Sequence, residues 1–166
     1  MDKDKFWKIF LRTSSEYRGL LWREDPILIE NVAGNAKLQM LHQSSYYEMD
    51  KKNSFMPGIA APLNTIMDSI PDTACFYVSA QIKLHSNAKG KLDWVASLEN
   101  EGRINFYKIF EIDIFPLYKN HTYKISKIIK VPKPKQRDDF LKIYLWNASG
   151  SKISIDSLAM QRIVLR

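Results

Sequence analysis

Apolar and polar residues alternate along two segments of the chain. Phe76, Val78, Ala80, Ile82 and Leu84 alternate with polar positions and Tyr77. In residues 141–147, apolar positions alternate with Lys142, Tyr144 and Trp146. A period of two predicts a β-strand with one face on a core and the other turned away from it.

The same pattern, with turn residues between the segments, extends through the second half of the chain. It predicts further strands at 92–99, 104–115, 123–131 and 152–164, separated by turns at 87–90, 100–103 and 147–150. The turn at 87–90 is expected to join 76–84 and 92–99 as a hairpin. Regular spacing of strands and turns predicts an all-β, two-sheet antiparallel β-sandwich over about residues 27–164.

The remaining segments are less regular. Residues 36–49 resemble one or two strands, and helix is expected only in the N-terminal part and within 60–68. Residues 1–25 form an aromatic-rich lead-in, in which Thr-Ser-Ser-Glu at 13–16 fits a capping box. The predicted domains are therefore this lead-in and a β-sandwich at 26–166. The lead-in either packs on the sandwich or marks the junction with a longer chain.

Composition restricts the class of protein. The chain has 166 residues, of which 45% are hydrophobic and 26% charged, as in ordinary globular domains. No apolar run is long enough to span a membrane. Cys75 is the single cysteine, so it cannot form an internal disulfide, and its strand-like context predicts a buried free thiol.

The net charge of +7 is concentrated in one region. Residues 116–142 hold eight Lys or Arg and two Asp. Lysines protect an edge strand from pairing with other chains, and they also bind polyanions. No aromatic residue is interleaved with residues 130–137, so nucleic-acid or heparin binding is predicted to be weak and nonspecific.

Catalytic motifs are missing. The sequence has no phosphate-binding glycine loop and no Gly-x-Ser-x-Gly elbow, and His42, His85 and His121 are far apart along the chain. Glu111 and Asp113 share a strand face without a predicted cleft between them. We therefore expect a protein that is not an enzyme.

Several short motifs resemble galactose-binding-like jelly-roll domains, the group that includes carbohydrate-binding modules. Residues 139–147, Gly150 and 153–158 resemble the closing hairpin of that fold, and Ile29-Glu30-Asn31 resembles its first strand. Residues 76–83, 92–99 and 104–107 are similar to its central strands, and the resemblance spans about 28–164.

The resemblance implies a jelly-roll β-sandwich that acts as a non-catalytic accessory module of a larger, surface-associated, extracytoplasmic protein. It also implies a structural calcium ion held by Glu30 and Asp156, which the first and last strands would bring together. In the final strand Ser157 replaces the second aspartate of the family pattern. An Asp156 that is hydrogen-bonded to backbone is the alternative.

The period-two pattern also selects candidate ligand-binding residues. Tyr107, Tyr144, Trp146 and Tyr77 fall opposite the core positions of their strands, and sugars stack on exposed aromatic rings. Lys142 and Gln81 are candidate partners for sugar hydroxyls. The predicted ligand is a glycan. The alternative is a structural or protein–protein interaction domain without a small ligand.

The calcium expectation has a direct test. If the ion is present, adding calcium raises the melting temperature and adding a chelator lowers it, because a ligand that binds only the folded state stabilises it. A melting temperature that responds to neither rules the site out.

Overall fold

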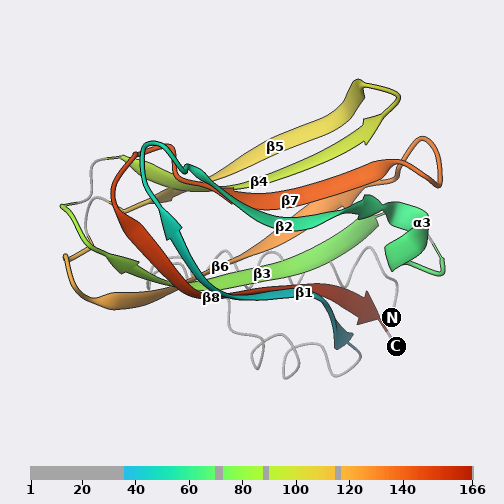
Figure 1. Cartoon of the computed structure of the whole chain (residues 1–166). Coiled ribbons are helices and arrows are strands. Elements are labelled where there is room, and N and C mark those ends of the chain that lie inside the picture. The colour runs from blue at the N-terminus through green and yellow to red at the C-terminus, as the bar shows by residue number, and fades with distance from the viewer. Residues whose placement is uncertain (1–35, 70–72, 88–89, 115–116, 166) are drawn as a thin grey trace.

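The computed structural model describes residues 36–69, 73–87, 90–114 and 117–165 (Figure 1). The lead-in at 1–25, its boundary at residue 26 and Glu30 lie outside this part, so the domain boundary stays a prediction. The elements in chain order are β1 (Ala36–Met49), β2 (Phe55–Pro62), α3 (Leu63–Ile66), β3 (Thr73–Leu84), β4 (Lys91–Asn100), β5 (Arg103–Asp113), β6 (Thr122–Pro132), β7 (Phe140–Trp146) and β8 (Ile153–Leu165).

The strands form two four-stranded antiparallel sheets packed as two layers (Figure 1). One sheet has the order β1-β8-β3-β6 and the other β2-β7-β4-β5. Strands that follow one another along the chain mostly alternate between the sheets, as in a jelly roll. This confirms the predicted all-β, two-sheet sandwich. The one described helix, α3, lies within the predicted range 60–68. Among the described residues, none of the helical structure is long and apolar enough to cross a bilayer.

Two predicted hairpins are wrong. β3 pairs with β6 and β8, whereas β4 pairs with β5 and β7, so the turn after β3 leads into the other sheet. The closing segments that the family resemblance paired, β7 and β8, also lie in different sheets. Alternation identifies a strand and its buried face, but a turn between two strands does not reveal whether the chain returns to the same layer.

The turn at 100–103 does close a hairpin. Asn100 pairs with Arg103, and Glu101 and Gly102 both have a positive φ, 46° and 75°. Two left-handed residues give a two-residue loop the twist that joins antiparallel strands. β4 and β5 are therefore neighbours in one sheet.

The core lies between the sheets and follows the predicted faces. Trp94, Ala96 and Leu98 of β4 are fully buried, as expected, together with the Phe76–Leu84 set of β3 and Leu141, Ile143 and Leu145 of β7. Cys75 is a buried free thiol, and burial raises its pKa to about 12.

The alternation along 104–115 predicts that Ile104 shares one face with Phe106, Phe110 and Ile112, but Ile104 does not join the core. The β4–β5 register shifts so that Leu98 pairs with Phe106 but Glu99 pairs with Ile104, which leaves Asn105 without an opposite residue. A one-residue bulge moves the following side chain to the other face. Ile104 is accordingly 63% exposed, whereas Phe106 packs against the core.

Two tryptophans that occupy opposite faces of one sheet should differ in their effect on stability. Trp94→Ala leaves a cavity in the core and is expected to cost about 3–5 kcal/mol of unfolding free energy. Trp146→Ala removes a half-buried ring outside the core and is expected to cost about 1 kcal/mol. Urea unfolding measures both. Equal losses would place Trp146 in the core.

Candidate functional site

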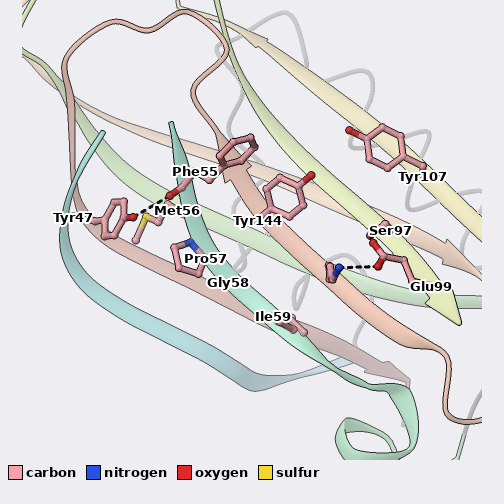
Figure 2. Close-up of a pocket in the computed structure, with 12 residues that line it drawn as sticks. Tyr47, Phe55, Met56, Pro57, Gly58, Ile59, Ser97, Glu99, Tyr107 and Tyr144 are labelled. Atoms are coloured by element: carbon pink, nitrogen blue, oxygen red, sulfur yellow. Dashed lines mark hydrogen bonds and ion pairs between the residues drawn. The ribbon is translucent and has the colours of Figure 1, made fainter. Parts of the chain in front are cut away.

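A groove of about 450 Å³ lies on the outer face of the sheet β2-β7-β4-β5 and extends over β2 (Figure 2). Twelve residues line it: Tyr47, Phe55, Met56, Pro57, Gly58, Ile59, Ala60, Ser97, Glu99, Tyr107, Lys142 and Tyr144. Three of the predicted ligand-binding residues, Tyr107, Tyr144 and Lys142, are among them.

Aromatic rings cover one end of this face. Phe55 of β2 is paired with Trp146 of β7, and their rings are parallel within 7° at a centroid distance of 6.0 Å. The edge of Phe55 also meets Tyr144, 5.8 Å away at 62°. Trp146 does not line the groove, but its partner Phe55 does. Phe55 is 53% exposed, so these rings offer a surface to a ligand.

Two tyrosines face each other across the groove. Tyr144 is half-buried on β7, and Tyr107 of β5 is 50% exposed (Figure 2). Burial raises the pKa of Tyr144 to about 12, and Tyr107 adds to the shift through its charge and a hydrogen bond. Tyr144 therefore stays a neutral hydroxyl throughout the physiological pH range.

The other end of the groove is polar. Lys142 Nζ lies 2.7 Å from Glu99 Oε2, and Ser97 donates a hydrogen bond to Glu99 Oε1 at 3.0 Å. The hydrogen bond from Lys142 is the main cause of the lowered pKa of Glu99. The ion pair thus presents a donor and an acceptor side by side, with little net charge.

A bulge in β2 shapes the wall beside Tyr144. Met56 pairs with Leu145 and Ile59 with Ile143, so Pro57 and Gly58 together occupy the position opposite Tyr144. A Cβ on Gly58 would lie 2.4 Å from the carbonyl oxygen of Ile143, closer than atoms can approach. Only glycine fits there, so the bulge depends on this residue.

Asp93 is an unusual residue on the same face. It is paired with Trp146 of β7 and Glu111 of β5, and only 4% of its surface is exposed. Its Oδ1 atom has no hydrogen-bond partner within the described part of the chain. Burial raises the pKa of Asp93, Glu111 adds to the shift, and Lys91 opposes it.

The structure does not bring all the predicted residues together. Tyr77 and Gln81 lie on β3, in the other sheet, and Tyr77 is fully buried. Neither can contact a ligand in the groove, which corrects their assignment to the site. Counting along a strand assigns a face, but it does not assign the sheet.

Sequence reasoning missed part of the groove. Phe55 lies before Pro57-Gly58, a pair that breaks a helix and that forms a bulge within β2. Ser97 and Glu99 had a usable signal, since they alternate with the core residues Trp94, Ala96 and Leu98. The two-residue alternation that selected Tyr144 would also have selected Ser97 and Glu99.

The predicted calcium site is only half described. Asp156 is exposed on β8, and Glu30 lies outside the described residues. In the described ranges no three His, Cys, Asp or Glu side chains come together in a way that could hold a metal ion. Asp156 is therefore not part of such a cluster within the described residues, and the calcium site stays a prediction.

Neither a family model nor a curated protein sequence matches this chain. In structure it is similar to a module titled "Family 16 Carbohydrate Binding Module-2", with 11% identity, a TM-score of 0.36 and coverage of 71% of this chain and 73% of that one. It is also similar to the xylan-binding domain CBM22-1 of Paenibacillus barcinonensis Xyn10C, with 12% identity and a TM-score of 0.37. This similarity covers 80% of this chain and 84% of that one.

A further likeness is to dimeric latent PorU from Porphyromonas gingivalis, with 13% identity and a TM-score of 0.39. It covers 79% of this chain and 13% of PorU. These similarities concern the fold alone.

The buried carboxylate predicts a pH effect. Because the pKa of Asp93 is raised in the folded state, its contribution to stability is full below the pKa of an unfolded Asp and is lost as pH rises through the folded-state pKa. Asp93→Asn, which cannot ionise, should therefore be more stable than wild type at pH 7.

That advantage should disappear on acidification below about pH 3.9, the ordinary pKa of Asp. Urea unfolding at the two pH values measures it. Asp156→Asn controls for the loss of one exposed negative charge. Equal stability of Asp93→Asn and wild type at pH 7 would contradict this prediction, because it would show that neighbouring groups fully offset the cost of burying the Asp93 carboxylate.

Proposed function

We propose that this domain is a non-catalytic carbohydrate-binding module and that the groove on the sheet β2-β7-β4-β5 holds the sugar. The observation that supports this most is the combination of exposed aromatic rings at one end with a Lys142–Glu99 pair at the other. As an accessory module it would attach a larger, surface-associated protein to its glycan.

The aromatic end matches the apolar faces of sugar rings. Stacking of a sugar face on Phe55, which is 53% exposed, buries C–H groups without requiring hydrogen bonds, and the parallel ring of Trp146 packs beside Phe55. Tyr144 and Tyr107 add aromatic surface with hydroxyl groups that can bond to a sugar.

The polar end matches sugar hydroxyls. A hydroxyl both donates and accepts, so neighbouring hydroxyls can bond to Lys142 and Glu99 at once. Because these two residues already neutralise each other, the groove offers no unpaired cation to a sugar acid. A neutral glycan segment is the ligand that this arrangement favours.

One observation favours a second candidate, a protein-interaction domain. Ile104, Tyr107 and Ile109 of the edge strand β5 are all exposed large hydrophobic residues. Grouped exposed apolar side chains mark many protein interfaces. Ile104→Ala should weaken a protein complex and leave glycan binding unchanged, because Ile104 is not among the residues that line the groove.

A glycan array followed by calorimetry on the retained glycan tests the proposal. Phe55→Ala should weaken binding by about 1–3 kcal/mol, taking the value for a base stacked on an aromatic ring as an analogy, because Phe55 lines the groove and is 53% exposed. Tyr118→Ala, which removes a 72% exposed tyrosine outside the groove, should bind as wild type does.

Wild-type protein that retains no glycan, or a Phe55→Ala variant that binds with unchanged affinity, would contradict the proposal. Thermal unfolding of each variant shows whether a loss of binding reflects the site or a loss of folded protein.

A further inference from the structure

The strand β5 ends its sheet and carries exposed apolar side chains. The sheet order is β2-β7-β4-β5, so within the described part of the chain no strand pairs with β5 on the side away from β4. Along β5, Ile104, Tyr107 and Ile109 are 63%, 50% and 38% exposed. An edge strand of this kind is a template on which another strand can pair.

The three exposed side chains occupy successive positions on one face. Ile104, Tyr107 and Ile109 are paired with alternate residues of β4 that face the outside of the sandwich. Asn105 has no opposite residue, so the bulge takes it out of the alternation and makes Ile104 the outward neighbour of Tyr107. The outward order is therefore Ile, Tyr, Ile, which is the same in both directions.

A stripe with this symmetry fits an identical stripe that runs the opposite way. In a two-fold symmetric contact, if residue i of one copy contacts residue j of the other, then j also contacts i. With the axis at Tyr107, this tyrosine lies opposite its own copy, and Ile104 lies opposite Ile109 of the second copy on either side of the axis. Each exposed apolar side chain thus gains an apolar cross-strand partner.

The charged residues on the other face of β5 favour the same register. There Lys108 falls opposite Phe106 of the second copy, and lysine ammonium groups are attracted to aromatic rings. A shift of the register by two residues places Lys108 opposite its own copy in one direction and Arg103 opposite Lys108 in the other. Like charges directly opposite each other destabilise a strand pair, so the register centred on Tyr107 is the favourable one.

The features that usually protect an edge strand do not block this pairing. Lysines and bulges commonly serve that purpose, and β5 has both. The bulge at Asn105, however, brings Ile104 into the apolar stripe, and Lys108 meets an aromatic ring in the favoured register. Protection of the edge would also not explain three exposed apolar side chains along it.

We infer that β5 pairs with β5 of a second copy of this chain, in an antiparallel, two-fold symmetric dimer centred on Tyr107. The two four-stranded sheets then form one continuous sheet across the two copies. Because each copy contributes a single edge strand, the contact belongs to the small, transient class of interfaces, and the dimer is expected to form reversibly as concentration rises. This inference does not depend on what the groove binds.

Sedimentation of the full chain over a range of concentrations tests association. Wild type should change from monomer to dimer as its concentration rises. Ile104→Lys should raise the dissociation constant by about tenfold or more, because the new ammonium group would lose hydration against Ile109 of the second copy. Tyr118→Lys adds the same charge at another exposed side chain, which is not on β5, and should dimerise as wild type does.

Wild type that remains monomeric at about 1 mM, the weak end of specific affinities, would overturn the inference. Equal weakening by Ile104→Lys and Tyr118→Lys would also overturn it, because added charge alone would then explain the loss.

Cysteine cross-linking with oxidised glutathione tests the register. Tyr107→Cys should form a disulfide-linked dimer, because Cβ atoms of directly opposite residues lie about 4.5–5.5 Å apart. Ile104→Cys and Ile109→Cys should cross-link with each other when mixed. Each should cross-link poorly with itself, because four strand positions separate it from its own copy by about 13 Å. The native Cys75 is buried and does not compete.

Tyr118→Cys controls for random collision. Cross-linking of Tyr118→Cys as strong as that of Tyr107→Cys, or a preference of Ile104→Cys for itself over Ile109→Cys, would contradict the inference. Thermal unfolding identifies any variant that is not folded, and if Tyr107→Cys fails to fold, the mixed isoleucine variants give the same test. Phe55→Ala should dimerise as wild type does, so failure of the glycan groove and failure of the dimer are distinguishable.

Discussion

β4 is buried on both of its faces, and the outer surface of its sheet is arranged around that constraint. Every residue from Leu92 to Leu98 is buried. One set of side chains lies in the core, whereas Asp93, Val95 and Ser97 point to the outside of the sandwich. Something other than the second sheet must therefore cover these three positions.

Side chains of the adjacent strands provide that cover. Val95 lies between Tyr144 of β7 and Ile109 of β5, and Asp93 lies beside Trp146. The groove reaches this covered strip at Ser97 and extends to Phe55 and Tyr107, which remain half exposed. The inner aromatic residues thus have a structural role, and the outer ones have the surface that a ligand needs.

Face assignments could be predicted from the sequence because they depend only on the two-residue period. Tyr107, Tyr144 and Trp146 do lie on the outer face of one sheet, as the alternation indicated. The sheet to which each strand belongs could not be predicted, since every strand of a sandwich shows the same alternation. Tyr77 and Gln81 were misplaced for that reason. Ile104 was misplaced because a bulge at Asn105 interrupts the count.

The distribution of charge distinguishes the groove from the edge strand β6. On the outer face of β2-β7-β4-β5, Lys142 is paired with Glu99 and Lys91 with Glu111, so the field near the groove is small and stacking can dominate recognition. Three lysines of β6, by contrast, lie on a strand whose partner β3 contains no Asp or Glu. Stacking on apolar rings depends little on ionic strength, whereas attraction between exposed charges is screened within a Debye length of about 8–10 Å. Recognition by stacking in the groove is therefore expected to be insensitive to salt.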